Sequence, residues 1–394
     1  MIGSIVVNLS ILGFFKYFGF FAESFVSFVG VFGLEPGVTT LNVILPIGIS
    51  FYTFQTLGYS IDVYRRKTKA EKNLADFALY VAFFPQLIAG PIERAGRLIP
   101  RIKSNRTVTA SDFNAGAFLI LWGFFKKVVV ADQLAQAVDR TYATSATPGA
   151  TSIVVAAIMF AFQIYCDFSG YTDIARGIAR LLGFDLMLNF RLPYFSVSPS
   201  DFWRRWHISQ STWIRDYVYV PLGGNRGSRK RVLANLMIAM SLAGLWHGAA
   251  WNYVIWGIYH GILLSAYSIV SSSSVFPNPR FLNSRPGWFL QVGVTFVLVT
   301  IGWMIFRAES MTQLGTWIAT IAQLDGGIPD SFTLKRFIFI FPVIAMQLFQ
   351  LKTNNLNAVL TLSMIKQSVV YSAILLGILV FGVLDGESFI YFQF

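Results

Sequence analysis

Long apolar stretches recur along the whole sequence, and short runs of basic residues separate them. A stretch of about 17–25 apolar residues can cross a bilayer as a helix. Only 13% of the 394 residues are charged, roughly half the share that a soluble domain carries, so a water-soluble fold could not cover its surface. Candidate spans lie near 4–25, 40–61, 113–131, 151–167, 232–250, 251–271, 287–306, 336–351 and 368–392. We therefore expect an all-α polytopic membrane protein with about nine to eleven transmembrane helices, forming a single domain over residues 1–394.

The basic residues indicate topology rather than nucleic-acid binding. The net charge is +12, but these residues sit in short runs between apolar stretches, where the positive-inside rule explains them and membrane lipid is the expected partner. The first stretch, from Ser4 to Phe25, has no signal-peptide cleavage site and is interpreted as a span, with Lys16 as an unusual residue inside it. The single cysteine, Cys166, excludes an internal disulfide.

Two basic runs flank an apolar stretch that is too short to cross. If both runs are cytoplasmic, residues 77–92 cannot span the membrane once, and Pro85 and Pro91 disrupt helical hydrogen bonding there. We expect a re-entrant segment at this point. The first run comprises Arg65, Arg66, Lys67, Lys69 and Lys72, and the second comprises Arg94, Arg97, Arg101, Lys103 and Arg106.

A third basic region, 191–231, predicts an amphipathic interfacial helix with Ser198 as its N-cap and Pro199 at its first helical position. At about 100° per residue, one face is largely aromatic and the other carries arginines. The aromatic face comprises Trp203, Trp206, His207, Gln210, Trp213, Ile214 and Tyr217, and the basic face comprises Arg204, Arg205 and Arg215. The glycine-rich turn PLGGNRGSRKR, which contains Arg226, follows and is suited to meeting anionic groups.

The three histidines are the main candidates for chemistry. An ionisable residue at membrane depth is costly and is a functional hypothesis by default. Burial disfavours the charged imidazolium, so a desolvated His247 would be neutral and able to act as a general base. A histidine on an aromatic face is more often a packed core residue, but Gly244 and Gly248 allow a backbone or a ligand to approach His247 closely. For His260, thirteen residues on and rotated away on a continuous helix, a structural role is expected.

Other candidates are weaker. Asp167 and Asp173 could line a cavity, although Asp173 is equally suited to a local pair with Arg176. No metal site is expected, since HExxH and cysteine pairs are absent and the three histidines are dispersed.

Five motifs in order, between about residues 40 and 270, resemble the membrane-bound O-acyltransferase family and most closely its bacterial alginate O-acetyltransferase branch. They are LPIGISFYTFQTLGYSIDVYRR, FFPQLIAGPIER, DFSGYTDIARGIARLLGF, FWRRWHISQSTWIRDYVYVPLGGNR and LWHGAAWNYVIWGIYHG. The resemblance implies that His247 is catalytic, that His207 is its partner, and that an acyl group passes from a thioester to a hydroxyl in a tunnel through the membrane. That branch usually carries further hydrophobic segments before the start of this chain, so the family's most N-terminal helices are expected to be missing.

The resemblance also implies partners. It suggests a bacterial inner-membrane protein that passes acetyl groups to periplasmic acetyltransferase partners and a polysaccharide acceptor. No cofactor would be bound permanently, and acetyl-CoA or another acyl thioester would be the donor substrate. Arg204, Arg205, Arg215 and Arg226 could hold coenzyme A phosphates, with lipid headgroup binding as an equal alternative.

Two rival functions remain open on sequence alone. One is another reaction in the same family, such as D-alanyl or other acyl transfer to teichoic acid, peptidoglycan or cellulose. The other is a transporter without chemistry, which interrupted spans and a buried histidine would also fit, although repeated halves are not visible.

Overall fold

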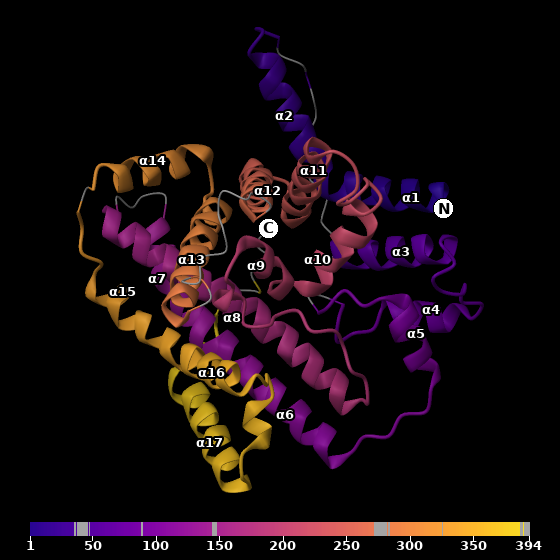
Figure 1. Cartoon of the computed structure of the whole chain (residues 1–394), viewed down its shortest axis with the longest axis vertical. Coiled ribbons are helices and arrows are strands. Elements are labelled where there is room, and N and C mark those ends of the chain that lie inside the picture. Colours follow the sequence, from indigo (N-terminus) through magenta and orange to yellow (C-terminus); the bar gives the residue numbers. More distant parts are fainter. Residues whose placement is uncertain are drawn as a thin grey trace.

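The computed structural model describes residues 1–34, 37, 46, 48–87, 90–143, 148–271, 282, 284–324, 326–386 and 389. Its regular elements are all helical within these residues, which confirms the expected all-α class (Figure 1). Seven helical stretches of the described chain are long and apolar enough to cross a membrane: Ile2–Gly30, Ala110–Tyr142, Ala150–Leu181, Trp251–Ser271, Arg285–Arg307, Ser331–Thr353 and Met364–Phe381. The other two expected spans also form helices, α3 (Ile49–Tyr64) and α11 (Arg229–His247), although 40–45, 47, 387–388 and 390–392 lie outside the described residues.

The centre of the molecule is an antiparallel pair of long helices (Figure 1). One is α8 (Ala150–Leu181), and the other runs through α6 (Ala110–Phe124), a π-helical segment η2 (Phe125–Ala131) and α7 (Asp132–Tyr142). Glycines face each other at two levels: a Cβ at Gly123 would lie 2.6 Å from the Gly170 carbonyl oxygen, and one at Gly177 would lie 2.6 Å from that of Gly116. Small residues of this kind let membrane helices approach closely.

The π-helical segment η2 brings charge into this pair at membrane depth. Lys126, which is 2% exposed, donates to Asp173 at 2.6 Å and to Ser169 at 2.9 Å. The expected local pair of Asp173 with Arg176 is present at 3.3 Å, so the carboxylate has two cationic partners. Buried charges survive in an apolar environment only when they are paired and hydrogen-bonded in this way.

The basic runs converge in space. Arg65 of the first run donates to the Asp216 carbonyl at 3.2 Å, and Arg94 of the second run pairs with the Asp216 carboxylate at 3.2 Å. Asp216 itself belongs to the third basic region, in η4 (Arg215–Tyr219). All three regions therefore lie together, as expected of loops on one side of a membrane.

The segment expected to re-enter forms no helix long enough to span a membrane within its described residues. Helix α4 (Leu74–Val81) has only eight residues, turns follow it, and the chain continues into α5 (Ala95–Lys103). Lys103, at the end of α5, pairs with Glu71, just before α4, at 3.0 Å, so both ends of the segment meet on the same side. Residues 88–89 lie outside the described chain.

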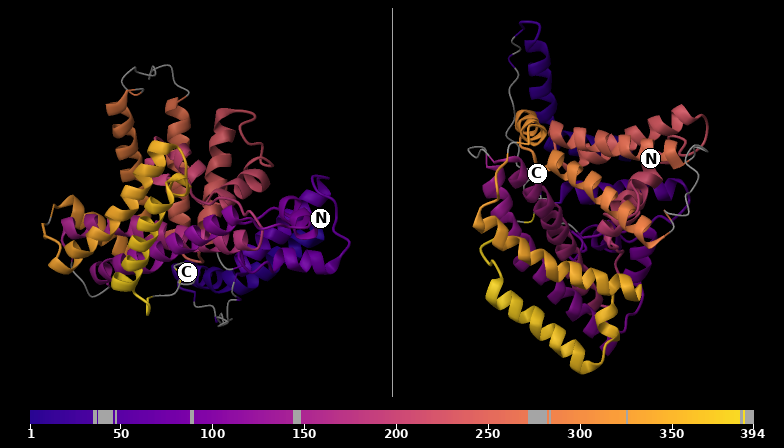
Figure 2. Two further views of the ribbon diagram at one scale, coloured as in Figure 1. Left: turned by 90° about the horizontal axis from the view of Figure 1, so that it is seen from below. Right: turned by 60° about the vertical axis from the view of Figure 1, so that its left-hand side comes forward.

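The remaining helices surround the central pair. Helices α14 (Met311–Ala322), α15 (Ser331–Arg336), α16 (Ile340–Thr353) and α17 (Met364–Phe381) follow one side of it, where α15 contacts α7 and α17 contacts α6 (Figures 1 and 2). Helix α12 (Trp251–Ser271) folds back along α11 and also packs on α13 (Arg285–Arg307). The N-terminal span comprises α1 (Ile2–Leu12), a π-helical segment η1 (Gly13–Tyr17) and α2 (Phe18–Gly30), and α2 projects beyond the other helices (Figure 1).

Candidate active site

The helix predicted after Ser198 is broken in the middle. It forms α9 (Pro199–Arg205) and α10 (Ile208–Ile214), with Ser198 accepting from the Asp201 N–H as the expected N-cap. Between them, His207 takes a left-handed conformation, φ 40° and ψ 54°. The break sends Trp206 and His207 into the core, at 1% and 0% exposure. A left-handed conformation is uncommon for a side-chain-bearing residue and is strained, and such strain clusters at functional sites.

The expected division of the segment into two faces is present despite the break. Arg204 and Arg215 are exposed and Arg205 is half-buried, whereas Gln210 and Trp213 are buried. The helical period describes each half correctly. The helical period cannot predict the turn between the two halves. This turn lets Trp206 and His207 both reach the interior.

His247 is the last residue of α11 and is 5% exposed. The Trp246 ring lies 5.7 Å from the His207 ring and 5.0 Å from the His247 ring, centroid to centroid. The Trp256 ring lies 5.0 Å from His247 and 4.8 Å from His260. The structure thus gathers the chain's three histidines in one buried cluster, with an indole between each successive pair.

The placement of His260 corrects an assumption made from the sequence. A continuous helix would have rotated it away from His247, but the chain leaves the helix at Gly248, with φ −163° and ψ 156°, and α12 then returns antiparallel to α11. His260 consequently lies level with the cluster, 1% exposed, with its Nε2 atom against Gly302.

The glycines near His247 serve the packing of this hairpin. A Cβ at Gly244 would lie 2.2 Å from the Tyr253 carbonyl oxygen, and one at Gly248 would lie 2.2 Å from the Tyr253 ring. Of the two expected roles, close approach by another part of the chain is therefore the one that the described residues support.

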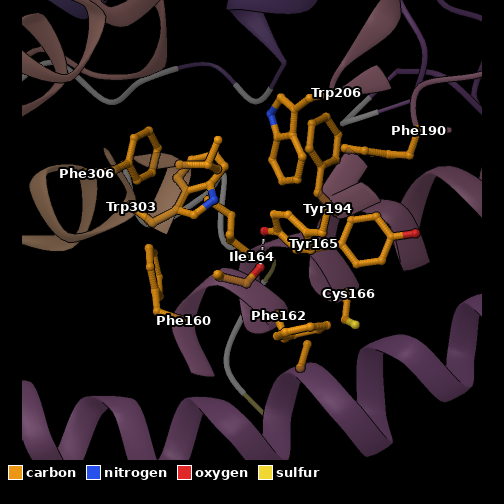
Figure 3. Close-up of a cluster of buried hydrophobic side chains, with 14 of the residues drawn as sticks. Phe160, Phe162, Ile164, Tyr165, Cys166, Phe190, Tyr194, Trp206, Trp303 and Phe306 are labelled. Atoms are coloured by element: carbon orange, nitrogen blue, oxygen red, sulfur yellow. Dashed lines mark hydrogen bonds between the residues drawn. The ribbon is translucent and has the colours of Figure 1, made fainter. Parts of the chain in front are cut away.

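Aromatic side chains enclose the cluster. Trp206 and Trp303 lie 4.8 Å apart, and Phe190 packs on Trp206 at 4.9 Å (Figure 3). Phe306 lies 5.4 Å from the His247 ring. The surroundings of the imidazoles are accordingly apolar. Electrostatic interactions and hydrogen bonds made there are stronger than in water.

A cavity of about 370 Å³ opens beside the cluster, between the α9–α10 segment and α11. Its wall on α11 is apolar and includes Ala239, Met240 and Ala243, while Arg204 and Arg215 line it from the other side. Two of the four predicted arginines are therefore at this cavity. The other two are not part of its lining: Arg205 pairs with Asp201 at 3.0 Å, and Arg226 lies on the exposed turn.

Two buried N–H groups at this cavity were not assigned a role from the sequence. Gln210 is 1% exposed and interacts with the His207 side chain, and its Nε2 atom has no hydrogen-bond partner among the described residues. The Nε1 atom of Trp203 is likewise buried without an acceptor in the described chain. An unsatisfied buried donor costs free energy, so these groups suit a ligand that brings acceptor oxygens. In the sequence, the signal for this site is Gln210, a polar amide on a largely aromatic face.

Comparisons with known proteins agree with these features. The sequence model of the membrane-bound O-acyltransferase family matches residues 65–307. A probable alginate O-acetylase of Pseudomonas aeruginosa is 46% identical over 80% of this chain and 61% of its own length. A peptidoglycan O-acetyltransferase of Helicobacter pylori is 34% identical (83% of this chain, 65% of that protein), and a teichoic acid D-alanyltransferase of Bacillus subtilis is 28% identical (68% and 70%). The chain thus spans about three fifths of the length of the Pseudomonas relative.

Proposed function

Because the chain belongs to the membrane-bound O-acyltransferase family, we propose that it transfers acetyl groups from a thioester donor to hydroxyl groups of a polysaccharide such as alginate. One observation carries the proposal: His247 lies at the end of α11, within a buried cluster of histidines and indoles and close to a cavity lined by arginines. The similarity to an alginate O-acetylase supports the choice of polysaccharide.

His247 is the general base in this proposal. Its imidazole takes the proton of the acceptor hydroxyl while that oxygen attacks the thioester carbonyl carbon. The carbon–sulfur bond then breaks, and the imidazolium returns the proton to the leaving thiolate. His207, linked to His247 through Trp246, is the partner residue and orients the groups around the base.

The donor occupies the cavity between α9–α10 and α11. Acetyl-CoA suits this space because its phosphates match Arg204 and Arg215, while its amide-bearing arm brings oxygens for the N–H groups of Gln210 and Trp203. The convergence of the basic runs at Asp216 supports entry from the cytoplasmic side. Arg205 and Arg226 then act at the entrance, on the anionic end of the donor or on lipid headgroups.

The acceptor lies on the opposite side of a bacterial inner membrane, where periplasmic acetyltransferase partners complete the modification. A second candidate is transfer of D-alanyl or another acyl group, to teichoic acid, peptidoglycan or cellulose. It is supported by the similarity to the Bacillus D-alanyltransferase and the Helicobacter peptidoglycan enzyme.

The test uses membranes that contain the full chain, incubated with radiolabelled acetyl-CoA and candidate acceptors, alginate first. Wild-type membranes are expected to transfer label, His247→Ala to transfer none at an equal amount of inserted protein, and His207→Ala to be strongly impaired. Full transfer by His247→Ala would overturn the assignment of the base. Transfer of D-alanyl but not acetyl label would favour the second candidate, and passage of substrate without covalent transfer would favour a transporter.

A further inference from the structure

A short segment of the N-terminal span forms hydrogen bonds to the end of α11. Helix α2 has no buried residue and α1 buries only Leu12, so most of the span faces outward. The exception is the π-helical η1, whose Tyr17 is buried against Ile49 and the partly buried Leu245. π-helical segments inside α-helices are frequent at functional sites.

Lys16 and Tyr17 of this segment bind the end of α11. The Lys16 Nζ atom donates to the carbonyl oxygen of Trp246 at 2.7 Å and to that of His247 at 3.3 Å. The Tyr17 hydroxyl donates to the Leu245 carbonyl oxygen at 2.9 Å. Three consecutive carbonyls, ending at the proposed catalytic residue, are thus bound by two side chains from a part of the chain more than 200 residues away.

These carbonyls need such partners. The last carbonyl oxygens of a helix have no N–H donor within the helix. In many helices a left-handed residue after the helix end turns the chain back, so that its N–H groups bind these carbonyls. Here Gly248 is extended, so α11 ends without that motif. Lys16 also brings a positive charge to the negative end of the helix dipole, which is the favourable arrangement.

The charge of Lys16 has no carboxylate partner among the described residues. Its other contacts include the Ser50 hydroxyl at 3.2 Å and the Trp246 and Tyr17 rings, whose centroids lie 5.9 and 6.0 Å from Nζ. An ammonium inside an apolar span is costly and marks function by default. The end of α11 is what compensates the charge, so the position of the ammonium and the position of the helix end depend on each other.

We propose that Lys16 is a positioning residue, which holds the end of α11 so that the His247 imidazole and the Trp246 ring keep their places in the histidine cluster. This inference rests on the proposed acyltransferase function. The ammonium acts through the backbone of residues 246 and 247 and does not touch substrate. Its removal leaves the donor cavity intact and lets the end of α11 shift.

The first test compares Lys16→Met, Lys16→Arg and Asn8→Leu in membranes, normalised to inserted protein. Lys16→Met is expected to lower kcat on the order of 30-fold with an unchanged KM for the donor, because a small displacement of a catalytic group costs rate rather than binding. Lys16→Arg keeps the donors and the charge and should retain most activity. Asn8→Leu removes a different bond of the same span, from the Thr56 hydroxyl at 2.6 Å, and should remain near the wild-type rate.

A chemical rescue separates the ammonium from the fold. Lys16→Cys can be alkylated selectively, since the chain's one native cysteine, Cys166, is fully buried. Alkylation with 2-bromoethylamine rebuilds a side chain of lysine's length with its charge, whereas 1-iodopropane gives the same length without charge. Recovery of rate with the amine alone is the expected result.

Equal recovery with both reagents, or wild-type kcat for Lys16→Met, would overturn the positioning role. Loss of inserted protein in Lys16→Met, with the normal rate per molecule, would show that the residue only anchors the span. Wild-type and His247→Ala membranes are the controls. If wild type transfers no label, the proposed acyltransferase function fails; if wild type transfers label and His247→Ala does not, the Lys16 variants test the positioning role alone.

Discussion

Gly244→Ala probes how closely α12 must pack against α11 for His247 to work. The added Cβ would meet the Tyr253 carbonyl oxygen at 2.2 Å and the Gly257 Cα atom at 3.0 Å. Both are backbone atoms, so no side-chain rotation can relieve the overlap, and the first contact falls about 1 Å short of van der Waals separation. The two helices must therefore separate by about this distance one turn before His247.

A displacement of this size predicts a large loss of rate. Misplacing a catalytic group by about 1 Å costs on the order of 100-fold in rate, while overpacking costs about 1–3 kcal/mol in stability. We expect Gly244→Ala to insert into membranes and to transfer acetyl label at about one hundredth of the wild-type rate per molecule.

Two other glycines provide matched controls for this variant. Gly293 in α13 and Gly315 in α14 have no atom within 4 Å of an added Cβ. Gly293→Ala and Gly315→Ala gain about 1 kcal/mol of helix propensity and should keep the wild-type rate. Wild-type transfer by Gly244→Ala would refute the reasoning that the α11–α12 separation positions His247.

The remaining predictions address the donor cavity and the central pair. Gln210→Leu should raise the KM for the donor about tenfold at an unchanged amount of inserted protein, because the cavity loses a buried N–H donor; steady-state kinetics in membranes would show it. Arg204→Gln combined with Arg215→Gln should raise the KM for acetyl-CoA but not for an acetyl-pantetheine that lacks phosphates; equal effects on both donors would favour lipid binding. Lys126→Met should destabilise the protein by about 3–5 kcal/mol by leaving the Asp173 carboxylate with only Arg176, and Lys126→Met with Asp173→Leu should recover much of the loss in thermal unfolding.

Local sequence signals predicted the fold class well, because hydropathy and charge report directly on contact with lipid. Each apolar stretch contains a helix, although several helix ends differ from the expected bounds by about ten residues, and the three basic regions meet at Asp216. The N-cap at Ser198 followed from a serine and a proline in adjacent positions. Each of these features depends on the chemistry of a short segment, which periodicity and composition can read.

The features that could not be predicted from the sequence depend on contacts between distant segments. The 3.6-residue period continues through Trp206 and His207, although the helix breaks there, because it is burial against other elements that favours the turn. His260 was assigned away from His247 because the reversal at Gly248 was not recognised. Lys16 could be identified only as an unusual residue in a span, because the carbonyl groups that it binds lie 230 and 231 positions further along the chain.

The proposed site also explains why interrupted helices are needed at membrane depth. A continuous helix satisfies its own backbone groups and offers only side chains to its surroundings, whereas a helix end exposes carbonyls that another residue can bind. The end of α11 at His247 gives Lys16 its partners, and the break at His207 lets two short helices direct Trp206 and His207 inward and Arg204 and Arg215 outward. Both interruptions would be penalised in contact with lipid, and both are enclosed by aromatic side chains instead. The dense aromatic packing around the histidines therefore has a second role beside excluding water, since it makes the irregular backbone that positions them tolerable inside a membrane.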